Sequence, residues 1–142
     1  MTGPIVVGVD GSETAHHAAL EARNLAVALG APLHVVSAFD TDRTEVIHSG
    51  SDTWIVSDAD STVATAKKVA ADLATPGLTI TYGAARGKPA EAIIAEAERM
   101  GARMIVVGNR GMQGIGRFLG SVANSVAHSA PCDVHIVKTV GS

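Results

Sequence analysis

The sequence predicts a single α/β domain, spanning residues 1–142, built on a five-stranded, doubly wound parallel sheet. Short apolar runs alternate with longer segments whose apolar residues recur every three or four positions. This alternation is typical of β-α-β units joined by right-handed crossovers. Aromatic residues make up only 3% of the 142 residues, so the core must consist of Ala, Val, Ile and Leu. Such a core suits a buried parallel sheet covered by Ala-rich helices.

The expected elements follow the chain in the order β-α-β-α-β-α-β-α-β. Apolar runs predict strands at Pro4–Val9, Leu33–Phe39, Leu78–Ala84, Arg103–Gly108 and Asp133–Val140. Capping residues and helical spacing predict helices at Glu13–Leu29, 58–75, 89–100 and Val122–Ser129. The polar segment Asp40–Val56 is expected to be irregular, with Trp54 covering the edge of the core.

Charge and composition exclude several classes of partner. Lysine and arginine number 11 against 14 acidic residues, a net charge of -3, which argues against a nucleic-acid-binding surface. No apolar run approaches the ~20 residues that a membrane-spanning helix needs. The N-terminal residues show no secretory signal. These features predict a cytoplasmic protein with neither a nucleic-acid nor a membrane partner.

The residues that bind metals or react in other proteins show no such pattern here. The six histidines have no metal-ligand spacing with Cys, Asp or Glu, so no metal site built by protein side chains is expected. His34, inside an expected strand, is interpreted as a core or edge histidine with satisfied hydrogen bonds. Cys132 is the single cysteine and cannot form an internal disulfide. It is interpreted as a small core or strand-edge residue.

The segment between the fourth expected strand and the last helix is rich in glycine, at positions 108, 111, 114, 116 and 120. Glycine allows positive φ and lets a ligand approach the backbone closely. The start of the following helix offers unpaired N–H groups and a partial positive charge. Arg110 and Arg117 add cationic donors. Together these features predict an anion site, above all for phosphates.

Two well-known phosphate-binding patterns do not fit this segment. The chain has no Gly-x4-Gly-Lys-Ser/Thr sequence, which excludes a P-loop NTPase. Gly114-x-Gly116-x3-Gly120 is one residue too long for the dinucleotide fingerprint and lies late in the chain. The alternative interpretation is a connection in which the glycines only close turns, although five are more than a turn needs.

Asp10 follows the first expected strand and has two interpretations. Its carboxylate can form an Asx-type turn that prepares the first helix. It can also accept hydrogen bonds from a ribose hydroxyl. If the first and fourth strands are neighbours, Asp10 and the glycine-rich segment face the same crevice at the carboxyl ends of the strands, where such sheets bind ligands.

Several pieces of the sequence, in order, resemble the universal stress protein family over nearly the whole chain. They include Ile5–Ser12 (IVVGVDGS), Gly87–Ile93 (GKPAEAI), Ile105–Gly111 (IVVGNRG), Leu119–Val122 (LGSV) and Ala130–Val134 (APCDV). The segments Gly108–Gly111 and Gly120–Ser125 resemble the ATP-binding type and its actinobacterial members in particular. The resemblance implies an adenine-nucleotide-binding fold with strand order 3-2-1-4-5.

The resemblance also implies a site, a cofactor and an assembly. In ATP-binding members the aspartate contacts ribose, the backbone after the second strand meets adenine, and the glycines and following hydroxyl hold the phosphates. The matching residues are Asp10, Ser37, Ala38, Gly108, Arg110, Gly111, Gly120, Ser121 and Val122. Mg²⁺ often accompanies the phosphates. Members form dimers, often through the last strand, which places Val134 and Ile136 at the interface.

One departure from the family pattern concerns the phosphate loop. The ATP-binding signature is Gly-x2-Gly-x9-Gly-Ser/Thr, whereas Gly111 and Gly120 enclose eight residues. Gly114 and Gly116 could let the shorter loop close differently and still reach the phosphates. The exact phosphate contacts and the preferred number of phosphates are therefore left open by the sequence.

The function expected from these residues is binding rather than catalysis: a regulatory module for ATP or a related adenine nucleotide, read by an unidentified protein partner. A slow ATPase is the enzymatic alternative, with Asp10 as the nearest candidate base. A dimeric interaction module that has lost nucleotide binding is a further alternative. A phospho-receiver domain is excluded because the third strand ends Tyr82-Gly83-Ala84-Ala85, without an acceptor aspartate.

Overall fold

The computed structural model describes residues 3–39, 44–49, 52–109 and 120–138, and the side chains of these residues outside 44–57. Five strands form one sheet: β1 (Ile5–Val9), β2 (Leu33–Phe39), β5 (Ile80–Arg86), β6 (Met104–Gly108) and β7 (Asp133–Val137). All neighbouring strands in this sheet are parallel, in the order β5-β2-β1-β6-β7. The predicted strand order 3-2-1-4-5 is therefore confirmed.

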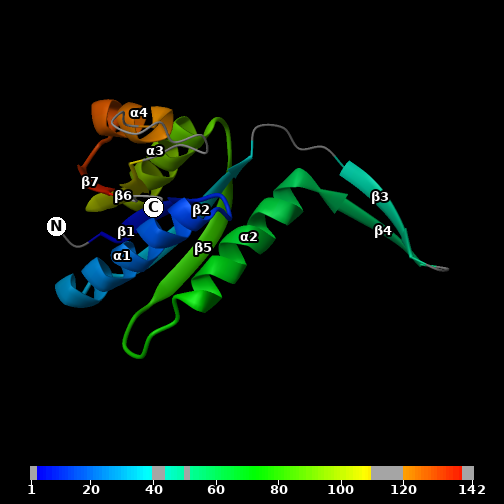
Figure 1. Cartoon of the computed structure of the whole chain (residues 1–142), viewed down its shortest axis with the longest axis horizontal. Coiled ribbons are helices and arrows are strands. Elements are labelled where there is room, and N and C mark those ends of the chain that lie inside the picture. Colours follow the sequence, from blue (N-terminus) through cyan, green and yellow to red (C-terminus); the bar gives the residue numbers. More distant parts are fainter. Residues whose placement is uncertain (1–2, 40–43, 50–51, 110–119, 139–142) are drawn as a thin grey trace.

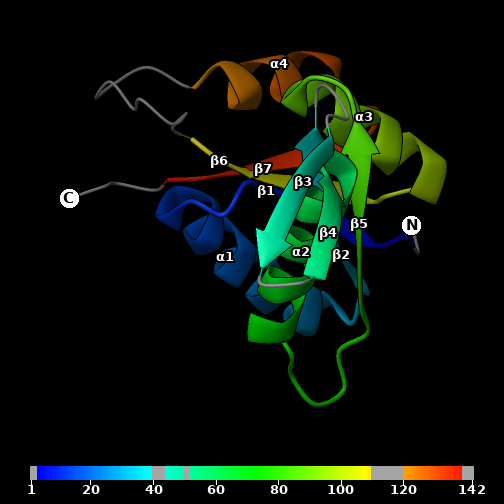
Figure 2. The same ribbon diagram turned by 90° about the vertical axis from the view of Figure 1, so that its right-hand side faces the viewer.

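In the described part of the chain, four helices cover the two faces of the sheet (Figures 1 and 2). They are α1 (Glu13–Leu29), α2 (Asp58–Asp72), α3 (Pro89–Met100) and α4 (Ser121–Ser129). The core on one face contains Ala residues of α1 and α2 against β1 and β2, and the core on the other contains residues of α3 and α4. Helices on both faces explain the near-continuous apolar runs, because both sides of each central strand are buried.

Local signals in the sequence set most of the boundaries. Ser12 caps α1 by accepting a hydrogen bond from the Ala15 N–H at 3.2 Å, and Gly30 ends the helix in the left-handed region at φ 65. Pro89 opens α3 and Gly101, at φ 61, ends it. These positions are the ones at which Ser, Pro and Gly favour helix starts and stops.

The segment after β2 differs from the expectation. Asp40–Val56 was expected to be irregular, but it contains an antiparallel hairpin of β3 (Thr44–Ser49) and β4 (Asp52–Ser57). Figure 1 shows this hairpin extending away from the sheet and helices. β-branched and aromatic residues on either side of a Ser-Gly-Ser sequence favour such a hairpin. The role expected for Trp54 concerns a side chain outside the described part of the structure.

Two strand boundaries are also shifted. The third strand of the main sheet was expected at Leu78–Ala84 but lies at Ile80–Arg86. The last strand was expected to continue to Val140; it is described to Val137, and residues 139–142 lie outside the described range. No helix in the described part of the chain is long and apolar enough to cross a membrane.

Candidate functional site

The turn between β1 and α1 places a carboxylate at the edge of the sheet. Asp10 follows the last residue of β1, and its Oδ1 accepts a hydrogen bond of 2.9 Å from the Ser12 N–H. Gly11 has φ 85, a conformation that residues with a Cβ rarely adopt. The Asx-type turn is thus present, and the exposed carboxylate keeps its second oxygen for a ligand, since no other described residue bonds to Asp10.

The end of β2 lies beside this turn, because Val9 is paired in register with Ser37. The buried Ser37 hydroxyl donates a 2.8 Å hydrogen bond to the Val9 carbonyl. Its side chain therefore joins two strands and is not available to a ligand, while its backbone is paired with Ala84 of β5. Ala38 is half-buried and lies one residue beyond this last paired position.

The direction of the Ala38 carbonyl follows from the alternation of backbone groups along a strand. The Pro32 carbonyl accepts from Ile5 of β1 at 2.9 Å, whereas the Phe39 carbonyl accepts from Gly87, after β5, at 2.8 Å. The backbone carbonyl groups of successive residues in a strand point alternately to the two neighbouring strands. The Ala38 carbonyl therefore points to the β1 side, like that of Pro32. It faces the crevice there, just past the end of β1.

The end of β6 and the start of α4 are held together by backbone hydrogen bonds. The Asn109 N–H donates to Val137 of β7 at 2.9 Å, and the Gly120 N–H donates to the Asn109 carbonyl at 2.7 Å. The α4 N-terminus, with exposed Ser121 and half-buried Val122, is therefore fixed beside Gly108. Gly120 is the N-cap and provides no side-chain cap. Arg110 and Gly111 lie outside the described residues.

The backbone at Gly120 corrects one part of the expectation. Its φ is -62 and its ψ is 156, which any residue can adopt. Glycine is therefore not required there for a positive φ. Glycine is a favoured residue at a helix N-cap, and it also leaves the backbone open to close approach.

The topology brings these parts to one edge of the sheet. The strand β1 lies between β2 and β6, and the chain order reverses there, since it proceeds from β1 to β2 and β5 on one side and to β6 and β7 on the other. Ligands of doubly wound sheets bind outside the carboxyl ends of strands at such a reversal. Asp10, Ala38, Gly108 and the first turn of α4 all lie at this end.

Residues at the start of α3 form part of the same region, and the sequence interpretation missed them. Lys88, Pro89, Ala90, Glu91 and Ile94 line a cavity of about 620 Å³ together with Ser121, Val122, Ser125 and Ser129 of α4. The sequence showed Pro89 only as a helix start. The cavity depends on packing between α3 and α4, for which the sequence carries no local signal.

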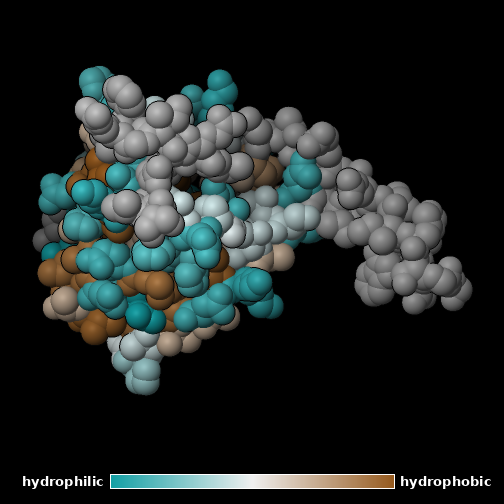
Figure 3. Space-filling view, in the orientation of Figure 1, coloured by the Kyte–Doolittle hydropathy of each residue, from teal (hydrophilic) through white to brown (hydrophobic). Residues whose placement is uncertain are grey.

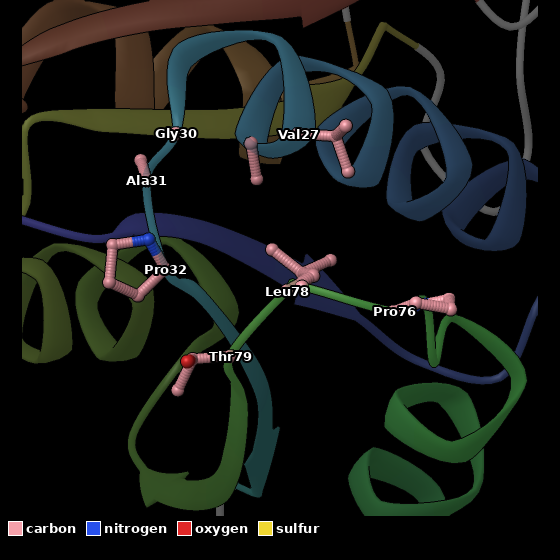
Figure 4. A pocket seen from close by; sticks show the side chains of 9 residues that line it. Val27, Gly30, Ala31, Pro32, Pro76, Leu78 and Thr79 are labelled. Atoms are coloured by element: carbon pink, nitrogen blue, oxygen red, sulfur yellow. The ribbon is translucent and has the colours of Figure 1, made fainter.

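A second cavity lies at the opposite ends of the strands (Figure 4). It has a volume of about 170 Å³ and is lined by Ala26, Val27, Gly30, Ala31, Pro32, Pro76, Gly77, Leu78 and Thr79. None of these residues carries a charge. The large hydrophobic side chains exposed on α1 include Val27 and Leu29, and hydrophobic surface is visible over α1 in Figure 3. Without charged groups, this end offers little to orient a phosphorylated ligand.

A buried polar cluster lies away from the crevice and is fully bonded. His34 Nε2 is 2.9 Å from Glu96 Oε2, and His34 Nδ1 is 2.7 Å from the Thr81 hydroxyl. The Arg99 Nε–H donates to Glu96 Oε1 at 2.6 Å. The Arg99 hydrogen bond, aided by His34, lowers the pKa of Glu96 although desolvation raises it. The interpretation of His34 as a satisfied core histidine is confirmed.

Two further groups bear on chemistry at the site. Among the described residues, no three His, Cys, Asp or Glu side chains lie close enough to hold a metal ion. Burial, with a smaller contribution from Asp133, raises the pKa of the Cys132 thiol. A raised pKa leaves less of the reactive thiolate.

Fold and site together define a doubly wound α/β protein with a polar crevice at the carboxyl ends of its central strands. The chain belongs to the universal stress protein family, whose family model matches residues 1–138. It is 34% identical to a universal stress protein of Thermus aquaticus over 137 residues, 94% of this chain and 97% of that protein. It is also 44% identical to universal stress protein A homolog 2 of Coxiella burnetii over 50 residues, only 34% of that protein.

Two solved structures of similar proteins contain adenine nucleotides. One is a universal stress protein in complex with cAMP, with 28% identity, a TM-score of 0.69, and coverage of 96% of this chain and 97% of that one. The other is the universal stress protein from Archaeoglobus fulgidus in complex with dAMP, with 26% identity, a TM-score of 0.65, and coverage of 96% and 98%. Adenine-nucleotide binding thus occurs in proteins similar to this chain.

Proposed function

We propose that this chain binds an adenine nucleotide, ATP among the candidates, at the carboxyl ends of β1, β2 and β6, and acts as a stress-response regulator. The observation that carries the proposal is the crevice itself. An Asp10 carboxylate with one oxygen fixed by the backbone lies at the same edge of the sheet as the α4 N-terminus. The cAMP and dAMP complexes of similar proteins support adenine as the base.

The nucleoside half of the ligand has two proposed contacts. The second Asp10 oxygen accepts a hydrogen bond from a ribose hydroxyl. The Ala38 carbonyl accepts one from the exocyclic amine of adenine, because it faces the crevice past the end of β1. Guanine carries a carbonyl oxygen where adenine carries this amine. In a guanine complex the Ala38 carbonyl would therefore face another hydrogen-bond acceptor instead of a donor. This geometry favours adenine over guanine.

The phosphates are proposed to lie between the end of β6 and the first turn of α4. Backbone N–H groups at the start of a helix bind anions well. The residues proposed for this contact are Gly108, Arg110, Gly111, Gly120, Ser121 and Val122. A magnesium ion would be held through the phosphates, since Mg²⁺ commonly combines one or two carboxylates with substrate phosphates and water.

We propose binding without efficient turnover. In the described part of the crevice, Asp10 is the candidate base, and the proposed ribose contact would occupy it. A slow ATPase remains the enzymatic alternative, and single-turnover hydrolysis of ATP by excess protein tests it. Complete retention of ATP over many hours supports a binding module.

The proposed assembly is a homodimer formed through β7. In the described sheet β7 is an edge strand that pairs with β6 alone, and an exposed edge favours association. The side chains of Val134 and Ile136 are half-buried against the core, so backbone pairing would dominate the contact. Sedimentation analysis across a range of concentrations tests this assembly. The cytoplasmic location and the actinobacterial resemblance stay predictions.

The site is tested by two substitutions at the start of α4. Gly120→Val keeps a backbone conformation that valine can adopt, but its side chain would occupy the space of an approaching phosphate, so we expect binding to be lost. Ser121→Ala should weaken binding by about 1 kcal/mol or somewhat more, the scale of one hydrogen bond to a charged group. Wild-type affinity in both variants would exclude this phosphate site.

A further inference from the structure

The cavity between α3 and α4 has the size and lining of a small-ligand site. Its volume of about 620 Å³ lies within the roughly 300–1,000 Å³ typical of ligand pockets. Pro89, Ala90, Ile94 and Val122 give it apolar walls, and Lys88, Glu91 and three serines are its polar lining. We call it the α3–α4 groove.

The groove is continuous with the proposed phosphate position. Ser121 and Val122 form the first turn of α4 and also line the groove. The first turn of α4 is therefore one wall of the groove.

The positive charge among the described lining residues of the groove comes from one side chain. Lys88 is exposed, is the single cation among the described lining residues, and forms no ion pair with a described residue. It is also the N-cap of α3, where the helix presents its positive end. Glu91 lies one turn further along α3 and would repel an anion that filled the whole groove. An anionic group is thus favoured only at the Lys88 end.

We propose that Lys88 makes this site sensitive to the number of phosphates on the nucleotide. The inference rests on the proposed function, because it extends the same ligand. The terminal phosphates of ADP and ATP pass from the α4 N-terminus to the Lys88 end of the groove and bind the ammonium group. AMP and cyclic AMP are too short to do so. A route through the groove gives the terminal phosphates a protein contact outside the shortened glycine loop.

The first test compares phosphate chain lengths in Lys88→Ala. Isothermal titration of the purified full chain with AMP and with ATP, without magnesium, gives the ratio of the two affinities. Loss of one charge-assisted contact should weaken ATP binding roughly five- to tenfold and leave AMP binding within about twofold. Lys67→Ala removes an exposed lysine of α2, away from the groove, and should change neither affinity.

A second test adds a charge to the groove instead of removing one. Ser125 lines the groove, whereas its exposed neighbour Asn124 on the same helix does not. Ser125→Glu should weaken ATP binding more than AMP binding, and Asn124→Glu should affect the two nucleotides equally. Measurement at about 0.15 M salt limits the reach of each charge to ~8 Å.

The outcomes separate this inference from the proposed function. An ATP-to-AMP affinity ratio unchanged by both Lys88→Ala and Ser125→Glu, in folded variants, overturns the role of the groove and leaves nucleotide binding intact. Failure of the wild-type chain to bind any adenine nucleotide overturns both. Selective loss of ATP affinity in the two groove variants, with unchanged controls, supports the inference.

Discussion

Two groups of polar side chains on this sheet differ in how their hydrogen bonds are used. His34 and Glu96 are 3% and 8% exposed, and partners occupy both histidine nitrogens and both carboxylate oxygens. At the carboxyl ends of the strands, Asp10 is exposed and uses one oxygen in its own turn. The first group has no bonding capacity left for a ligand, whereas the second is fixed in place and still has some. A candidate binding group is distinguished from a structural one by hydrogen-bonding atoms that the protein leaves unused, and not by polarity alone.

The most severe test of this difference removes Glu96. Glu96→Ala would leave the buried His34 Nε2 without its partner, which should cost about 1–3 kcal/mol in the free energy of unfolding, the range for an unsatisfied buried group. Urea denaturation measures this loss. Nucleotide affinity of the folded variant should not change. The exposed neighbour Glu98 offers a matched control, for which Glu98→Ala should lie within about 0.5 kcal/mol of wild type. Equal stability of the two variants would contradict a structural role for the cluster.

The reverse pattern is expected at Asp10. Asp10→Asn keeps a side-chain oxygen for the Ser12 N–H but loses the charge, so the turn and the stability should be retained. Affinity for an adenine nucleotide should fall about tenfold, equivalent to ~1.4 kcal/mol, near the scale of one hydrogen bond to a charged group. Calorimetric titration measures it. A variant that binds as well as wild type would reduce Asp10 to its turn-forming role.

Ser37 sharpens the comparison, because it lies at the crevice but has a buried, bonded side chain. Ser37→Ala removes its hydrogen bond to Val9 and should lower the free energy of unfolding by about 1 kcal/mol. Nucleotide affinity should stay at the wild-type value, since the hydroxyl is bonded to Val9 and the backbone is paired with β5. Weaker nucleotide binding with unchanged stability would instead assign the hydroxyl to the ligand.

The smallest effect is a pH dependence that originates in the buried cluster. The Arg99 hydrogen bond holds the pKa of Glu96 below its ordinary value in the folded state. The ionised Glu96 carboxylate therefore contributes fully to the free energy of unfolding above the unfolded-state pKa of ~4.3. This stabilisation is lost as the pH falls through the lower pKa of Glu96 in the folded state. Arg99→Ala should be less stable than wild type at pH 7, and the gap in urea midpoint should close below about pH 4. A gap that stays constant down to pH 3 would exclude this linkage.

Much of the fold could be predicted because its signals are local. Ser12, Gly30, Pro89 and Gly101 mark helix ends by their own backbone and capping preferences. The alternation of elements then predicts a parallel sheet, whereas its strand order was expected from the family resemblance. The β3–β4 hairpin was missed because its apolar residues are adjacent, as Val46-Ile47 and Trp54-Ile55-Val56, and lack the alternation typical of a half-buried strand.

The site could be predicted only in part, for a different reason. Asp10 directly follows β1 and Gly108 is the last residue of β6. The topology of the sheet alone brings the carboxyl ends of these strands together. The α3–α4 groove and the His34–Glu96 pair depend on where α3 crosses the sheet. His34 and Glu96 are 62 positions apart, and no periodicity in the sequence relates them. Contacts of this kind are set by packing between layers.

The central claim is that the crevice selects an adenine nucleotide. Isothermal titration of the wild-type chain with AMP, cyclic AMP, ATP and the matching guanine nucleotides, with and without magnesium, tests it most directly. We predict micromolar binding of at least one adenine nucleotide and at least tenfold weaker binding of its guanine counterpart, about the ~1.4 kcal/mol of one hydrogen bond at the Ala38 carbonyl. Equal affinity for the two bases, or no binding of any adenine nucleotide, would contradict the account.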